Sequence, residues 1–145
     1  MSEVFAKPEY QKNVSVPSSL NNKTKSKSGR GLSDISGNAD SISGYITRVD
    51  GQDTVVGGTS DMAPLLAGLV ALLNQALGKP VGFLNPKLYQ LKSSSTTLRD
   101  ITEGNNKVNT APGYTSQIGW DACTGLGSPN GTQLLAALKA LQKMK

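Results

Sequence analysis

One hydroxyl side chain, Ser60, stands where a serine can act as a nucleophile. It follows Gly57, Gly58 and Thr59 and opens a predicted apolar helix. A helix N-terminus presents unpaired N–H groups and the positive end of the helix dipole, which lower the cost of negative charge on a nearby oxygen. The glycines before it let a substrate backbone come close. The alternative is structural, because Ser and Thr near a helix start commonly cap free backbone N–H groups. At this point both interpretations stay open.

A serine nucleophile needs a base, and the sequence contains no histidine. A Ser-His-Asp triad within this chain is therefore excluded. A Glu/Asp pair on one helix face requires a spacing of three or four residues. No acidic pair is four apart, and the pairs three apart fall in a predicted turn (Asp50 and Asp53) and a predicted loop (Asp100 and Glu103). We do not expect Asp61 to be the base, because a neighbour in the same turn points away from the hydroxyl more often than towards it.

The elements around this serine are predicted from periodicity and turn residues. Tyr45–Val49 and Thr54–Val56 read as a hairpin with Asp50-Gly51 in its turn. Pro64 near the start and Gly78 at the end bound the following helix. Apolar residues cover nearly every face of that helix, so we expect it to be surrounded by protein and central to the fold.

Further along the chain the signals are shorter. We predict a strand around Leu32–Ser36, a helix that starts at Asn85-Pro86 and runs through Leu91, and irregular structure over Arg99–Pro129. Thr132 is predicted to cap a last helix. The apolar face of this helix consists of Leu134, Leu135, Leu138 and Leu141.

Length and composition indicate one domain or a piece of one. The chain has 145 residues, of which 1–30 are polar and read as an irregular N-terminal segment, while 31–145 hold most of the apolar residues. The net charge of +5 comes partly from Lys23–Arg30 and the C-terminus. We interpret these runs as solvated surface rather than a nucleic-acid site, because no aromatic residues interleave with the first run.

Cysteine usage and targeting signals exclude other classes. Cys123 is the single cysteine, so the chain has no internal disulfide and no cysteine metal site, and we expect a small buried residue there. Polar residues interrupt the most apolar stretch, and we do not expect a membrane span. The N-terminus lacks the basic and apolar regions of a signal peptide.

Four segments in order resemble one protein family. They are "FAKPEYQ", "GRGLSDISGNADSISGYITRVDGQ", "GGTSDMAPLLAGLVALLNQALGKPVGFLNPKLYQL" and "RDITEGNN…GWDACTGLGSPNGTQLLAAL". Together they are similar to the sedolisin and kumamolisin family of serine-carboxyl peptidases, and the last three cover about Gly29 to Leu138. The resemblance implies the C-terminal part of an α/β, subtilisin-like domain, in which helices flank a mostly parallel sheet that would here be incomplete.

The family also implies a mechanism without histidine. Ser60 matches its nucleophile, a Glu is the base, an Asp one helical turn on orients that Glu, and a separate Asp serves the oxyanion hole. These carboxylates lie N-terminal to the segment that "FAKPEYQ" resembles, so the chain starts after them. Carboxylate bases imply hydrolysis of peptide bonds at acid pH. Gln52 and Gly57 to Thr59 are candidates for lining the substrate cleft.

The same resemblance implies a calcium site in the loop after Arg99. Asp100 and Ile101 match the first ligand pair, and Gly119 and Asp121 match the end of the second group. Gln117 stands where the family has a glycine whose carbonyl is a ligand, which leaves the carbonyl but restricts φ. The alternative for Asp100 and Asp121 is that each caps a turn through its side chain.

Two functions follow from these observations. In the first, the chain is a fragment of an acid-acting endopeptidase, is inactive alone, and cleaves a peptide or protein substrate once an N-terminal half is supplied. In the second, it is a non-catalytic, calcium-stabilised remnant that self-associates or binds another protein through surface that the parent fold buries. Family resemblance implies a secreted protein, and we expect neither nucleic acid nor a membrane as partner.

Overall fold

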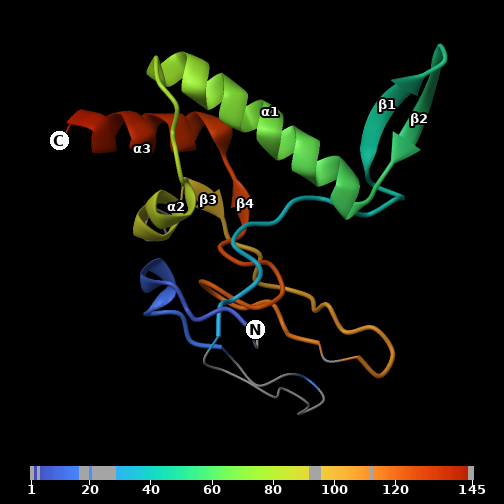
Figure 1. Cartoon of the computed structure of the whole chain (residues 1–145). Helices are drawn as coiled ribbons and strands as arrows, with labels where there is room; N and C mark the ends of the chain where they lie inside the picture. Colours follow the sequence, from blue (N-terminus) through green and yellow to red (C-terminus); the bar gives the residue numbers. More distant parts are fainter. Residues whose placement is uncertain are drawn as a thin grey trace. The chain divides into compact units, whose positions relative to one another are not determined.

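The computed structural model describes residues 2, 4–16, 20, 29–91, 96–111 and 113–143 of the 145-residue chain. The chain divides into two compact units, with the elements labelled in Figure 1. Unit 1 combines Met1–Ser36 with Phe83–Lys145, and unit 2 is the continuous segment Gly37–Gly82. Most of the basic run at Lys23–Arg30 lies outside the described residues.

The hairpin of unit 2 is the predicted one. Strand β1, Tyr45–Val49, pairs antiparallel with β2, Gln52–Val56. Asp50 and Gly51 both adopt positive φ, at 49° and 79°. Two positive φ values in a two-residue loop define a type I′ turn, whose twist matches that of the strands. The prediction is confirmed, with β2 starting two residues earlier than expected.

Helix α1, Thr59–Leu77, follows the hairpin and carries Ser60 as its second residue. It ends as predicted at Gly78, which adopts the left-handed conformation and donates its N–H to the Gln75 carbonyl at 3.2 Å. Pro64, predicted near the start of the helix, is its sixth residue rather than a first-turn residue, so its missing N–H removes a helical hydrogen bond. In a regular helix that N–H would bond the Ser60 carbonyl.

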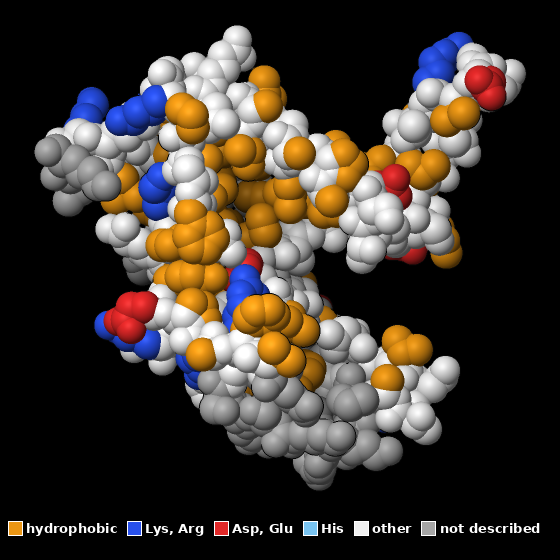
Figure 2. All heavy atoms as spheres, viewed as in Figure 1, with side chains coloured by type: hydrophobic (Ala, Val, Ile, Leu, Met, Phe, Trp, Pro, Cys, Tyr) orange, Lys and Arg blue, Asp and Glu red, His pale blue; other side chains and the backbone are white. Residues whose placement is uncertain are grey.

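The expectation that protein surrounds α1 is also wrong for this chain. Leu73 is the one buried residue of α1, whereas Leu65 and Leu72 are 47% and 64% exposed. Hydrophobic side chains gather over α1 on the face shown in Figure 2. On length and composition alone, α1 could also cross a membrane, since an 18-residue window of its 19 residues has a mean hydropathy of 1.3.

Unit 1 contains short elements joined by loops. They are a 3₁₀ turn, η1 (Glu9–Gln11), helix α2 (Asn85–Leu91), strand β3 (Leu98–Arg99), strand β4 (Ser128–Pro129) and helix α3 (Gly131–Lys143). β3 and β4 pair antiparallel, and the chain between them is irregular apart from isolated bridges. Helix α2 and this long irregular segment confirm the prediction.

Two local predictions in unit 1 are wrong. The residues around Leu32–Ser36 form no strand. Two backbone hydrogen bonds, from Leu126 N–H to the Asp34 carbonyl and from Ser36 N–H to the Gly127 carbonyl, and the bonds of the Asp34 side chain hold the segment instead. The cap of α3 is Asn130, not Thr132: Asn130 Oδ1 accepts the Gln133 N–H at 3.1 Å. Both residue types cap helices, and the start at Gly131 decides between them. Leu134 and Leu138 are buried, while Leu135 and Leu141 are partly buried.

A polar network centred on Asp34 joins distant segments of unit 1. Asp34 Oδ1 accepts the Tyr89 hydroxyl at 2.9 Å and Gln11 Nε2 at 3.2 Å. Asp34 Oδ2 accepts Asn85 Nδ2 at 2.7 Å and forms an ion pair with Arg30. Gln11 is fully buried, and burial raises the pKa of the Tyr89 hydroxyl above its ordinary value. The network thus ties η1, the 30–34 segment and α2 together.

The described residues do not form the sheet of the expected fold. The described residues hold two two-stranded antiparallel sheets and three α-helices. A mostly parallel sheet flanked by helices, which the family resemblance implied, is therefore not present within the described residues. The hydrophobic core of unit 1 lies instead around buried side chains that include Leu88, Trp120 and Leu134.

Candidate active site around Ser60

Ser60 is exposed at the N-terminal end of α1. The residue before the helix, Gly58, is extended (φ 160°, ψ 159°) and makes no side-chain cap. The first turn of the helix starts with a backbone hydrogen bond instead, in which the Asp61 N–H donates to the Gly58 carbonyl at 3.1 Å. The purely structural interpretation, in which Ser60 or Thr59 caps the helix, is therefore not what the structure shows. The Ser60 hydroxyl is left available beside free helix N–H groups.

No carboxylate in the described residues forms a hydrogen bond with the Ser60 hydroxyl. Asp61 Oδ2 lies 3.3 Å from the position that a Cβ on Gly58 would occupy. The Asp61 side chain thus turns back over the residue before the helix, and the expectation that it is not the base stays a prediction. Within the described part of the chain, a proton acceptor for Ser60 is missing.

Two close contacts hold the turn that leads to Ser60. The Met62 side chain fills the space beside Gly37, where a Cβ would lie 2.0 Å from Met62 Sδ, and the Tyr45 hydroxyl lies 3.6 Å from the same sulfur. On the other side, a Cβ on Gly57 would lie 2.3 Å from the Asp40 carbonyl oxygen. Residues before β1 therefore pack directly on both ends of this turn.

The 38–43 loop that meets Gly57 is fixed by its own hydrogen bonds. Asn38 Oδ1 accepts the Asp40 N–H at 3.0 Å, and Asn38 Nδ2 donates to the Ser43 carbonyl at 2.6 Å. The Asp40 carboxylate accepts the Ser43 hydroxyl and the N–H groups of Ile42 and Ser43. These bonds, the Ser43 hydroxyl first, hold the pKa of Asp40 below its ordinary value. Sequence reasoning missed this loop; the spacing of Gly37, Gly44 and Gly57 was the available signal.

The residues of the predicted calcium site lie in unit 1. Asp100 Oδ2 accepts the Gly119 N–H at 2.7 Å, and Asp121 Oδ2 accepts the Gln117 N–H at 3.1 Å. The loop 117–121 is therefore tied to both carboxylates. Gly119 has φ 83°, a conformation that favours glycine. Ile101 follows Asp100 and is partly buried.

The two carboxylates differ in how fully they are used. Asp121 is fully buried, and its oxygens also accept the N–H groups of Cys123 and Thr124 and the Thr124 hydroxyl. It caps a turn, as the structural alternative stated. Asp100 Oδ1 is buried with no hydrogen-bond partner. A buried oxygen without a partner is costly, and a cation would relieve that cost.

This oxygen is the observation that favours a calcium ion at the loop. The described residues contain no group of three or more Asp, Glu, His or Cys side chains suited to a metal. Calcium ligands in proteins include backbone carbonyls as well as carboxylates. The oxygen atoms of this loop are of the kind that binds calcium, and Asp100 Oδ1 is the side-chain oxygen without a hydrogen-bond partner. Calcium binding remains a prediction.

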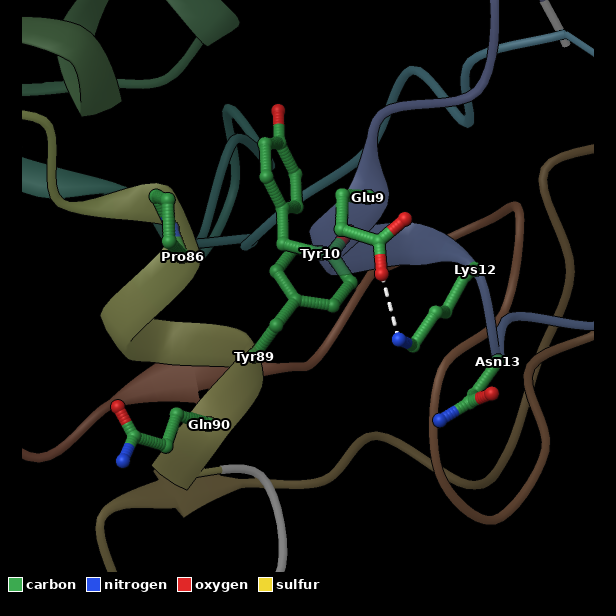
Figure 3. A pocket seen from close by; sticks show the side chains of 7 residues that line it. All are labelled: Glu9, Tyr10, Lys12, Asn13, Pro86, Tyr89 and Gln90. Carbon is green, nitrogen blue, oxygen red and sulfur yellow. Dashed lines mark hydrogen bonds and ion pairs between the residues drawn. The ribbon is translucent and has the colours of Figure 1, made fainter.

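A shallow cavity of about 220 Å³ lies in unit 1 between η1 and α2. Figure 3 shows its lining, with Tyr10 and Tyr89 facing it and the Glu9–Lys12 ion pair at 2.5 Å on one side. The rings of these two tyrosines are 5.1 Å apart, and Tyr10 also contacts Phe83 edge-to-face. This cavity is separate from the residues of unit 2 that carry Ser60, and it holds none of the predicted site residues.

Known proteins similar to this chain share a single family. Kumamolisin of Bacillus sp. (strain MN-32) is 53% identical over 95% of this chain and 24% of its own length. Tripeptidyl-peptidase 1 of Dictyostelium discoideum is 37% identical over 92% of this chain and 24% of its own length. Pseudomonas sedolisin, solved in complex with pseudo-iodotyrostatin, matches with a TM-score of 0.80 and 30% identity, over 96% of this chain and 35% of that chain. No family model matches the chain.

These matches identify the protein family of the chain. The chain belongs to the sedolisin/kumamolisin family of serine-carboxyl peptidases. It spans about a quarter of the length of the curated relatives it matches. The structural match therefore covers part of the sedolisin fold, which agrees with the small antiparallel sheets seen here.

Proposed function

We propose that this chain is part of an acid-acting serine-carboxyl endopeptidase in which Ser60 attacks the peptide bond. The base Glu, its orienting Asp and the oxyanion Asp would come from residues outside this chain. The observation that carries the proposal is the state of Ser60: an exposed hydroxyl at a helix N-terminus, with no carboxylate bonded to it in the described residues. Family membership supports it.

In the assembled site, this chain would supply the nucleophile and part of its electrostatic setting. The Ser60 hydroxyl would lose its proton to the outside carboxylate as it attacks the carbonyl carbon. The free N–H groups of the first turn of α1 favour negative charge near that end of the helix. Because a carboxylate accepts the proton, the reaction requires the base to be ionised at the low pH at which it operates.

The exposed face of α1 supports the need for a second piece. Leu65 and Leu72 are large apolar side chains left in water, which is costly unless another chain covers them. We propose that α1 packs inside the complete peptidase domain rather than in a bilayer. A secreted location and a calcium ion at Asp100, with carbonyls of Ile101, Gln117 and Gly119 and the Asp121 carboxylate nearby, are part of the same proposal.

Hydrolysis of a denatured protein substrate at acid pH tests the proposal. The chain would be assayed alone and mixed with the kumamolisin catalytic domain truncated before the segment that this chain matches. We expect no hydrolysis by the chain alone, hydrolysis by the mixture, and none by a mixture with Ser60→Ala. Activity of the chain alone, or of the Ser60→Ala mixture, would contradict the assignment.

A second function is favoured by the same exposed helix. In it, the chain is a non-catalytic remnant that self-associates or binds another protein through α1. A mixture that forms a folded complex without hydrolysing the substrate would favour this function. Sedimentation velocity of the chain alone, over a hundredfold concentration range, would then reveal whether copies associate with each other.

A further inference from the structure

The β1–β2 hairpin has strand edges without partners in the described part of the chain. β1 and β2 form a sheet of two strands only. Hydrogen-bonded and non-hydrogen-bonded pairs alternate along an antiparallel ladder, and the turn at Asp50-Gly51 closes on a hydrogen-bonded pair. By this alternation, Asp53 and Val55 are the residues of β2 whose backbone N–H and C=O groups face outwards.

The outward groups of β2 are not used elsewhere in the described residues. Outside the ladder, no backbone hydrogen bond involves Asp53 or Val55. The Val55 side chain is 50% exposed. This edge therefore offers two donors and two acceptors at a spacing of two residues, which is the pattern with which an extended peptide pairs in β-strand addition.

The same edge leads to the nucleophile. Val55 is five residues before Ser60, a separation that extended chain spans in at most about 17 Å. Between them, a Cβ on Gly58 would meet only Asp61 Oδ2 at 3.3 Å and Ser60 N at 3.9 Å. No other backbone crowds that side of Gly58, so a second backbone has room to approach there. At Gly57 the corresponding space is closed by Asp40.

We propose that the outer edge of β2, through the backbone of Asp53 and Val55, binds an extended segment of the peptide substrate and leads it to Ser60. The proposal rests on the function proposed above and names a substrate-binding surface within this chain. A substrate side chain next to Val55 would contact its exposed methyl groups, which favours apolar residues at that place.

A second copy of the chain is the competing occupant of this edge. β2 has five residues, about 17 Å of strand. Pairing of two such strands buries far less than the roughly 1,200 Å² that a stable protein–protein interface needs. A peptide requires no such area, because its affinity for the complete site adds contacts on both sides of the reacting bond. The size of the edge thus favours a peptide.

The test measures binding without hydrolysis, in the full chain carrying Ser60→Ala. The probe is a fluorescein-labelled hexapeptide with alternating valine and threonine between terminal lysines, followed by fluorescence anisotropy. Val55→Pro removes the outward N–H of β2 and leaves the ladder bonds intact. Ile46→Pro is the matched control, because Ile46 is the cross-strand partner of Val55 and its N–H faces the opposite edge.

We expect Val55→Pro to weaken binding about tenfold or more, and Ile46→Pro to change it less than about twofold. Hydrogen exchange of the Ser60→Ala chain, without any strand substitution, gives an independent readout: added peptide should protect the amides of Asp53 and Val55. Equal weakening by both prolines, protection at Ile46 and Arg48 instead, or no binding at all would overturn the inference.

The outcomes separate this inference from the proposed function. Suppose that the chain binds the peptide, that Val55→Pro removes this binding, and that the mixture with the N-terminal piece never hydrolyses the substrate. This result would refute the proposed function and leave the inference standing. If the mixture hydrolyses the substrate and Val55→Pro leaves the rate unchanged, the inference is refuted and the proposed function stands. A concentration-dependent dimer that Val55→Pro abolishes, with no peptide binding, would show that a second copy occupies the edge.

Discussion

Replacing Asp34 by alanine should strongly destabilise unit 1. The substitution removes the acceptor of the Tyr89 hydroxyl, of Asn85 Nδ2 and of the Arg30 ion pair. Gln11 keeps other partners, since its Nε2 also donates to the Gly31 carbonyl and the Tyr89 hydroxyl. The Arg30 guanidinium keeps its hydrogen bonds to the Gly31 and Leu32 carbonyls but loses its counter-charge, while the Tyr89 proton and one Asn85 N–H lose their acceptor.

The magnitude follows from burial. Removing one partner of a buried ion pair costs about 3 to 5 kcal/mol. The Arg30 and Asp34 side chains are 25% and 16% exposed, so water offsets part of the loss. We therefore expect the lower end, about 3 kcal/mol, a large share of the total stability of an ordinary domain. At this chain length the melting temperature should fall by about 10 °C.

The measurement is thermal unfolding followed by the fluorescence of Trp120, the single tryptophan, which donates to the Ser33 carbonyl next to Asp34 at 2.9 Å. Glu9→Ala is the control, because it breaks an ion pair of the same unit whose partners are 82% and 63% exposed. That variant should melt within error of the original chain. Asp34→Asn should restore little, since its NH₂ group faces other donors. If Asp34→Ala melts no lower than Glu9→Ala, the network does not hold the unit together.

Three more predictions concern pH, the loop and the glycines. Burial raises the pKa of the Tyr89 hydroxyl, so the unfolded chain loses this proton at a lower pH than the folded chain. The free energy of unfolding should therefore fall above about pH 10, by up to about 1.4 kcal/mol per pH unit. Urea titrations at pH 9 to 11.5 should show this slope, and Tyr89→Phe should flatten it. Calcium at a hundred times its dissociation constant should stabilise the chain by about 2.7 kcal/mol. This stabilisation should vanish in Asp100→Asn and persist in the control variant Asp53→Asn. If Asp100→Asn keeps the full stabilisation, the loop does not hold the calcium ion. Gly57→Ala should cost about 1 to 3 kcal/mol, because its Cβ would meet the Asp40 carbonyl. Gly68→Ala, with open space around it in α1, should stabilise by about 0.5 to 1 kcal/mol; equal effects of the two glycine substitutions in urea unfolding would refute the packing argument.

The elements that could be predicted from the sequence are those set by neighbours along the chain. Asp50-Gly51 supplies the two positive φ values of the hairpin turn, and Gly78 supplies the left-handed end of α1. The start of α2 at Asn85 is likewise local. Glycines and a helix start drew attention to Ser60, the family resemblance made it the candidate nucleophile, and its role stays a prediction.

The features that could not be predicted depend on contacts across the sequence. Asp34 bonds Tyr89, 55 residues away, and the segment in which a strand was expected around Leu32 also makes backbone hydrogen bonds with Leu126 and Gly127. The exposure of α1 could not be predicted either, because the apolar pattern of a helix does not specify which segments cover it. The predicted calcium site shows a mixed outcome, because Asp121 caps a turn while Asp100 keeps a buried oxygen free.

The order of the two units along the chain has a consequence for synthesis on the ribosome. Unit 2 is continuous and is complete once Gly82 has emerged. Unit 1 is interrupted by it, and its closing contacts join residues as far apart as Ser33 and Trp120. Asp34 therefore has to wait for Asn85 and Tyr89, and Ser33 for Trp120, because these partners all follow unit 2 along the chain. Distant contacts of this kind slow folding, so the segment around Asp34 should stay exposed longer during synthesis than unit 2 does.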